Sequence, residues 1–213
     1  MKKLFSANNS IFQFLSLLAD LMILTLQWIV ACIPVVTIGA ATTALYSCAM
    51  KRNQEEIRLF RDFWSAFRKN FLQATILWIV VLALLFTVIA DIYLVFFTDF
   101  APGTIVKLLM LMLAFVVAIV TAYIFPLQAF FVNPVGRTLK NAFLLSVMYL
   151  PVSVVIVFVN AIPVLAWMLI PTFFNRTLFL WVALSGGITA YVNGKMLRRI
   201  FERHITDEQP DTP

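Results

Sequence analysis

Long runs of apolar residues alternate along the chain with short polar and basic stretches. Each run reaches or approaches the roughly 20 residues that a helix needs to cross the hydrocarbon of a bilayer. The runs are continuous and do not alternate apolar with polar residues, which argues against a membrane β-barrel. We therefore predict an all-α protein, a polytopic bundle of transmembrane helices, with crossings at residues 11–33, 71–97, 104–131, 142–162 and 177–193.

A shorter segment, residues 35–50, has the composition of a buried membrane helix. Gly39, Thr43 and Ser47 recur at four-residue spacing, and small residues at that spacing let helix backbones approach closely. These three residues are a candidate helix-packing face. Pro34 precedes the segment. Proline disfavours helix just before it and fits well at the start of the next helix. We interpret residues 35–50 as an interior crossing, and a pore-lining or re-entrant element is the alternative.

The distribution of positive charge favours six crossings over five. With residues 35–50 counted as a crossing, every Lys and Arg except Lys107 and Arg176 falls on one side of the membrane. With five crossings, one basic cluster would lie on the other side. Loops rich in Lys and Arg stay in the cytoplasm. The pattern predicts a multi-pass protein of the bacterial cell membrane with both termini cytoplasmic.

Residues 54–70 have the pattern of an amphipathic helix. Asn53 can cap its start, with Glu56 three residues later. Aromatic residues occupy one stripe and basic residues flank it, as in helices that lie along a membrane interface. We expect a cytosolic elbow helix before the next crossing. Its candidate surface for lipid or a partner protein consists of Phe60, Arg61, Phe63, Trp64, Phe67 and Arg68.

The composition excludes a water-soluble protein. Hydrophobic residues make up 62% of the chain and charged residues 12%, against about 45–50% and 25% in soluble domains. The mean hydropathy is +0.96. The net charge of +6 comes from residues between apolar runs, as topology signals do, and not from a nucleic-acid surface. We expect a single membrane domain over residues 1–213 with a disordered tail at 205–213.

Residues that could support catalysis are few. His204 is the only histidine and lies in the tail, and Cys32 and Cys48 lie at opposite ends of the second apolar segment. This set cannot form a usual zinc site. The motifs of ATPases and common hydrolases do not occur. We expect no enzyme activity, no metal and no cofactor.

Three polar residues inside apolar runs are candidate intramembrane sites: Asp20, Asp91 and Asn160. Charged side chains at depth in a membrane are costly and usually have a purpose. Asp20 falls near the middle of the first helix and Asp91 toward the outer end of the third, so they are too far apart in depth for a shared-proton dyad. Asp20 is either a proton or cation site or a structural hydrogen-bond partner of a hydroxyl or of Asn160.

Two segments resemble the YesL family of small bacterial membrane proteins. They are "PVVTIGAATTAL", residues 34–45, and "DFWSAFRKNFLQATILW", residues 62–78. The resemblance implies a multi-pass membrane protein of unestablished molecular function, often encoded beside sugar uptake systems. It implies no catalytic residues.

Two functional hypotheses follow. In the first, the chain is a non-enzymatic membrane protein that assists or regulates carbohydrate uptake through a transporter partner. In the second, it is a small transporter or channel, with Asp20 as the coupling or selectivity residue. The expected partners are the lipid bilayer and a sugar transporter component or a second copy of the chain, and not nucleic acid.

Overall fold

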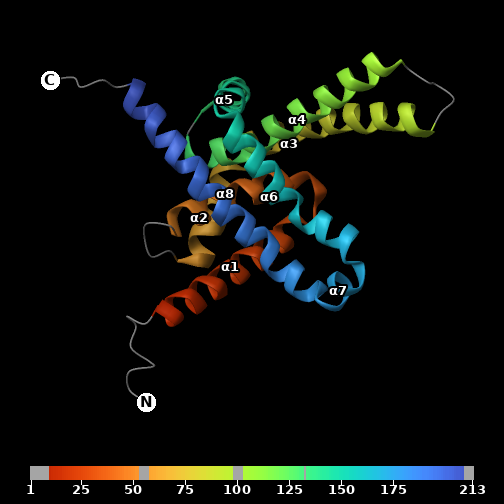
Figure 1. The fold of residues 1–213 in the computed structure, drawn as a ribbon. Helices are drawn as coiled ribbons and strands as arrows, with labels where there is room; N and C mark the ends of the chain where they lie inside the picture. Colours follow the sequence, from red (N-terminus) through yellow and green to blue (C-terminus); the bar gives the residue numbers. More distant parts are fainter. Residues whose placement is uncertain (1–9, 53–57, 98–102, 132, 209–213) are drawn as a thin grey trace.

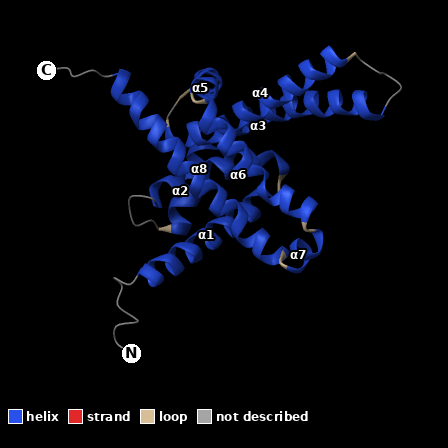
Figure 2. Ribbon diagram, viewed as in Figure 1, coloured by secondary structure: helices blue, strands red, loops and turns tan. Residues whose placement is uncertain are grey.

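The computed structural model describes residues 10–52, 58–97, 103–131 and 133–208, and within these ranges the regular structure is helical, with no strand (Figure 2). The prediction of an all-α fold is confirmed. In chain order the elements are α1 (Ser10–Cys32), η1 (Val35–Thr37), α2 (Ile38–Arg52), α3 (Leu59–Phe97), α4 (Thr104–Phe130), α5 (Val135–Met148), α6 (Leu150–Leu169), α7 (Pro171–Arg176) and α8 (Leu178–Glu208).

Four helices in the described part of the chain are long and apolar enough to cross a membrane. The candidate spans are Gln13–Cys32 in α1, Leu59–Val95 in α3, Thr104–Phe130 in α4 and Leu150–Leu169 in α6. The chain is therefore a membrane-helix protein.

The packed core of the molecule surrounds α2. This helix has 15 residues, about 22 Å at 1.5 Å per residue, and ten of them are buried. It packs against α1, α3, α4 and α8 (Figure 1). The turn before α2 is fixed to α3, because Trp78 Nε1 donates a hydrogen bond of 2.9 Å to the Val35 carbonyl.

The other end of the molecule is more open. The α3–α4 hairpin and the α6–α7–α8 segment point away from the core in different directions (Figure 1). Only 11% of the candidate span in α3, and the same share in α6, is buried inside the protein. The helices are thus well packed at one end and diverge toward the other.

The helix over residues 59–70 is not separate from the following crossing. It is the first part of α3, which runs without interruption from Leu59 to Phe97. No glycine or proline occurs between these residues, so nothing in the backbone chemistry ends the helix at the membrane surface. The predicted cap, Asn53 with Glu56, lies outside the described residues.

The predicted crossing at residues 142–162 is divided differently in the structure. Residues 135–148 form a separate helix, α5, and α6 begins at Leu150 with Pro151 in its first turn. Proline fits the first turn of a helix but cannot donate the hydrogen bond needed in its interior. Pro151 therefore marks a helix start, where the prediction placed it inside a run.

The last helix is also longer than predicted. A short helix, α7, precedes it, and α8 continues past residue 193 to Glu208. Part of the tail that we expected to be disordered is therefore helical, and residues 209–213 lie outside the described ranges.

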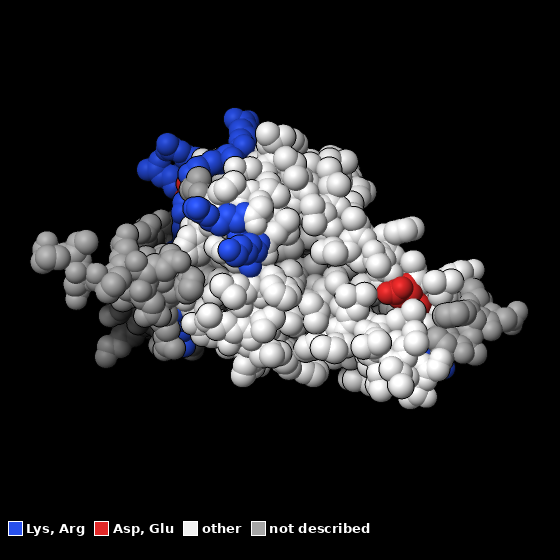
Figure 3. Space-filling view, turned by 90° about the horizontal axis from the view of Figure 1, so that it is seen from above, with Lys and Arg blue, Asp and Glu red and all other residues white. Residues whose placement is uncertain are grey.

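Basic residues gather at the well-packed end. In Figure 3 most of the Lys and Arg side chains visible on this face collect at one end of the molecule, and an acidic group lies toward the other. Arg198 of α8 joins three helices there. Its Nη1 donates to the Met50 carbonyl at 2.9 Å, near the end of α2, and its guanidinium lies 5.9 Å from the centre of the Phe130 ring, at the end of α4.

Candidate functional site

Asp20 forms an ion pair with Arg52. Arg52 Nε donates to Asp20 Oδ2 at 2.7 Å, and the two side chains are 25% and 22% exposed. The pair joins α1 to the last turn of α2. Among the described residues, Asp20 thus bonds a cation, and neither a hydroxyl nor Asn160, the partners that the sequence suggested. Because Arg52 neutralises the carboxylate, a coupling role for Asp20 would require this pair to open.

Asp91 lies in the outer part of the α3–α4 hairpin. It lines a cavity of about 290 Å³ between the two helices, together with Lys107 of α4. The remaining lining is mostly apolar, including Val88 and Leu111. Asp91 and Lys107, which are opposite in charge, therefore line the same cavity. Asp91 lies 71 positions along the chain from Asp20.

Asn160 belongs to a polar cluster that joins α2, α6 and α8. Its Nδ2 donates to the Ile156 carbonyl at 2.8 Å, and its Oδ1 accepts from Asn193 Nδ2 at 3.4 Å. Asn193 is fully buried and also donates to the Tyr46 hydroxyl at 3.4 Å. The Oδ1 atom of Asn193 has no hydrogen-bond partner among the described residues. This cluster lies between helices whose other contacts are mainly apolar.

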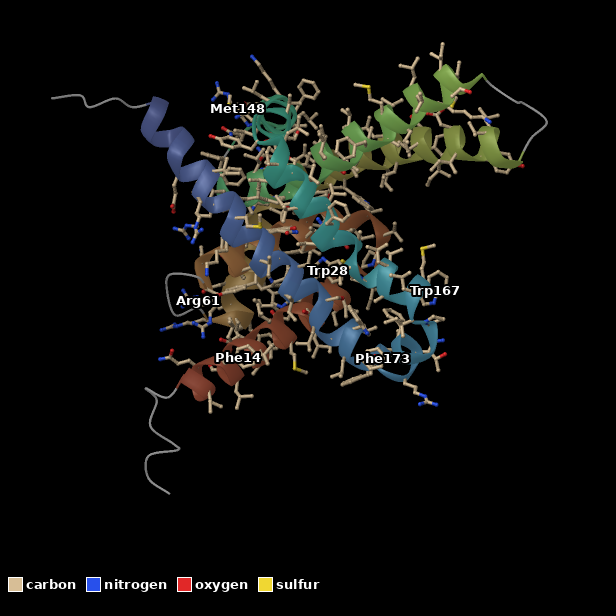
Figure 4. All side chains as sticks on the ribbon, viewed as in Figure 1. Phe14, Trp28, Arg61, Met148, Trp167 and Phe173 are labelled. Atoms are coloured by element: carbon tan, nitrogen blue, oxygen red, sulfur yellow. The ribbon has the colours of Figure 1, made fainter. Side chains whose placement is uncertain are left out.

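A second contact adds Trp28 to this region. Trp28 is labelled in Figure 4. Its Nε1 donates to Thr42 Oγ1 at 3.2 Å, which connects α1 to α2. Thr42 and Tyr46 are one helical turn apart on α2, so their side chains share a face.

Another polar chain ties α4 to its neighbours. Gln128 is 2% exposed, and its Nε2 donates to Gln73 Oε1 at 2.7 Å. Its Oε1 accepts from the Thr138 hydroxyl at 2.9 Å. Both ends of one amide are thus used between α3 and α5. This arrangement places Gln128 in a structural role.

The candidate packing face on α2 lies partly against α3. Gly39 and Thr43 are buried, and Ser47 is partly buried. A Cβ atom on Gly39 would lie closer than 3.0 Å to the carbonyl oxygen of Ala74 and to the Cβ of Trp78. The two backbones therefore approach so closely at Gly39 that only glycine fits.

The aromatic stripe of residues 59–71 faces the protein more than was expected. Phe63 is fully buried, and Trp64 and Phe67 pack against the core. The rings of Phe63, Trp64, Phe67 and Phe71 form a series of edge-to-face contacts with centroids 5.5–5.7 Å apart. From the predicted lipid or partner surface, only Phe60, Arg61 and Arg68 are exposed. The reason is that this part of α3 lies on α2 and not along a free interface.

Metal-binding groups are not gathered in the described part of the chain. No group of three or more His, Cys, Asp or Glu side chains occurs there.

Comparison with known proteins covers the N-terminal core of the fold. Residues 21–92 match the model of a family described as "Protein of unknown function, DUF624". The matched segment runs from within α1 through α2 and most of α3, about a third of the chain. The family description names no activity. No curated protein matches the chain, and no solved structure matches it.

Sequence reasoning identified Asn160 but missed the residues that surround it. Asn193 is an amide in a run otherwise rich in apolar and small residues, and that position was a usable signal because polar side chains in membrane helices commonly hydrogen-bond across helices. Tyr46, Thr42 and Trp28 carried no comparable signal, because aromatic and small residues are common in membrane helices for packing alone.

Proposed function

We propose that the chain is a non-enzymatic membrane protein that assists or regulates the uptake of a carbohydrate by binding a transporter component. The proposal is carried by exposed apolar faces on the outer halves of α4 and α6. These halves point away from the core in different directions (Figure 1), and the side of the molecule between them is called the gap below. The carbohydrate part rests on the resemblance of residues 34–45 and 62–78 to the YesL family.

At the core end, α4 and α6 pack tightly through one face of each helix. Tyr123 and Ser153 form a hydrogen bond of 2.9 Å, and Ile119 and Ile156 are almost completely buried. These residues define the contact face of each helix.

The same faces continue into the outer halves, where they lose their partner. On α4 the face of Ile119 and Tyr123 continues at Met112, seven residues before Ile119; Met112 is 65% exposed. On α6 the face of Ser153 continues at Val164 and Trp167, which are 58% and 55% exposed. Figure 4 shows Trp167 at the outer end of the molecule. Both outer halves therefore expose apolar side chains on the faces that, nearer the core, pack against each other.

A helix from a partner protein would fill this gap more closely than acyl chains do. Membrane helices associate through close packing, because lipid is as apolar as their side chains and supplies no hydrophobic drive. A rigid helix between two diverging faces gains contacts on both sides. A partner with a transmembrane helix, such as the membrane subunit of a transporter, is thus the occupant that the geometry favours.

We further propose six crossings, α1, α2, α3, α4, α6 and α8, with both termini in the cytoplasm. The support is the collection of Lys and Arg at the end where α2 and α4 finish and where Arg198 of α8 joins them. Lys and Arg near helix ends set orientation toward the cytoplasm.

Site-specific photocrosslinking in cells tests the partner. A photoreactive residue is placed in the gap at Met112 or at Trp167. The matched controls are Leu113, about 100° around α4, and Leu169, on the opposite face of α6; both are exposed, at 46% and 77%. We expect adducts with the membrane subunit of a sugar transporter from the two gap positions only, and slower sugar uptake in cells that lack the chain.

Two outcomes would contradict the proposal. One is capture of lipid alone at Met112 and Trp167. The other is sugar flux through liposomes that contain only the purified chain, since this result would make the chain a transporter in its own right.

A further inference from the structure

A separate cavity lies between α2, α3, α4 and α6. It has a volume of about 340 Å³ and is lined by residues of α2, α3, α4 and α6: Thr42, Tyr46, Leu85, Ala118, Thr121, Ala122, Phe125, Pro126, Val157 and Asn160. A water molecule takes about 30 Å³ in the liquid, and small-molecule sites begin near 300 Å³. The cavity can therefore hold an organic molecule of modest size.

The polar groups around the cavity have unused hydrogen-bonding capacity. The Tyr46 hydroxyl accepts from Asn193, so its own hydrogen is available to donate. Thr42 Oγ1 accepts from Trp28, and its hydrogen has no acceptor among the described residues. One N–H of Asn160 goes to the Ile156 carbonyl, which leaves the second available.

The cavity also offers a hydrogen-bond acceptor, in addition to these donors. The Thr121 hydroxyl donates within its own helix to the Val117 carbonyl at 2.8 Å. Its lone pairs are therefore available to accept a hydrogen bond. The cavity offers donors from α2 and α6 and an acceptor from α4.

The neighbouring Asn193 indicates that these groups are held in place for a purpose. Asn193 is fully buried and uses its amide nitrogen for Tyr46 and Asn160, while its Oδ1 stays without a partner in the described structure. An unpaired buried acceptor is costly and calls for an explanation. Here the Asn193 amide nitrogen orients two side chains of the cavity, Tyr46 and Asn160, while its carbonyl oxygen is left without a hydrogen bond among the described residues.

We propose that this cavity binds an uncharged small molecule that carries two or more hydroxyl groups. None of the described residues that line it is charged, and an ion would lose its hydration there without a counter-charge. A hydroxyl both donates and accepts, which suits the mixed set of donors and acceptor. The apolar part of the lining, including Phe125 and Val157, suits a carbon skeleton.

This inference goes beyond the proposed function and does not depend on it, because the test uses the purified chain alone. The chain is placed in lipid nanodiscs, and equilibrium binding of tritiated glycerol, xylitol and D-glucose is measured. We expect saturable binding of at least one of the three. D-Glucosamine and D-gluconate, which carry charge, should compete at least tenfold less well than D-glucose.

Matched variants locate the site. Thr121→Val removes the acceptor without changing the size of the side chain, and binding should weaken about tenfold, the effect of one lost hydrogen bond. Thr87→Val is the control, because Thr87 also donates only to its own helix, to Ala83, and does not line the cavity. Ala122→Leu fills the cavity and should abolish binding without loss of any hydrogen bond.

Three results would overturn the inference. These are the absence of saturable binding for all three probes, equal affinity in the Thr121→Val and Thr87→Val proteins, and unchanged binding in Ala122→Leu. Polyols stabilise many proteins by exclusion from their surfaces, so a melting temperature that rises without saturation does not count as binding.

Discussion

Replacement of Gly39 by alanine tests the packing of α2 on α3. The added Cβ would lie closer than 3.0 Å to the Ala74 carbonyl oxygen and to the Trp78 Cβ, and neither belongs to the flexible end of a side chain. The helices must therefore move apart. Overpacking of this kind costs about 1–3 kcal/mol of folding free energy. Because both contacting atoms are rigid, we expect a cost near the upper value for Gly39→Ala.

The net effect includes the helix propensity of alanine. Alanine is favoured over glycine inside a helix by about 1 kcal/mol, which offsets part of the cost and leaves a loss of about 2 kcal/mol. For a chain of this length, 1 kcal/mol shifts the melting temperature by about 2–4 °C. We expect Gly39→Ala to melt about 4–8 °C below the wild type in detergent, measured by thermal unfolding.

Gly136→Ala is the matched control. Gly136 lies in the first turn of α5, and a Cβ there would meet nothing within 4 Å. This variant should be as stable as the wild type or slightly more stable. The packing argument fails if the Gly39→Ala and Gly136→Ala proteins melt at the same temperature.

Three further sets of substitutions test individual contacts by the same unfolding assay. Asp20→Asn and Arg52→Gln, alone and together, should show a coupling of about 1 kcal/mol, the size of a partly exposed ion pair; strict additivity would show that the pair at 2.7 Å contributes nothing. Gln128→Leu removes the bonds to Gln73 Oε1 and from Thr138, whose hydroxyl keeps only the Pro134 carbonyl at 3.4 Å. The change should cost about 1–3 kcal/mol, so an unchanged melting temperature would contradict the role assigned to this amide. Phe63→Ala removes a fully buried ring and should cost about 3 kcal/mol or more. Phe60→Ala, at a position that is 65% exposed, should have little effect. Equal losses of stability in the two variants would show that Phe63 is not packed in the core.

The sequence predicted those features that depend on local pattern. Continuous apolar runs identified most of the long helices, and the small residues of α2 indicated a close helix contact. The boundaries of the helices were harder to predict. Residues 142–162 look like one apolar run, and the break before Pro151 is decided by whether a proline starts a helix or interrupts it, which the run itself does not reveal.

The partners of polar residues were beyond sequence reasoning because they depend on tertiary structure. Arg52 is 32 positions from Asp20, and Asn193 is 147 positions from Tyr46. The two asparagines of the cavity cluster, Asn160 and Asn193, come together only because α6 and α8 pack side by side. In the same way, Phe63 has the pattern of an interfacial residue, and its burial follows from α2 lying across it.

The account depends most on α2 being a membrane helix at the centre of a bundle whose basic end faces the cytoplasm. Labelling with a membrane-impermeant thiol reagent tests this directly, in a chain whose Cys32 and Cys48 are replaced by alanine. Single cysteines are introduced at Lys51, Lys195, Lys107 and Arg176. We predict that the first two react only from the cytoplasmic side and the last two only from outside. A further single cysteine at Val35, in the turn before α2, should react only from outside. If it reacts from the same side as the cysteine at position 51, α2 does not return the chain to the cytoplasm and the account is wrong.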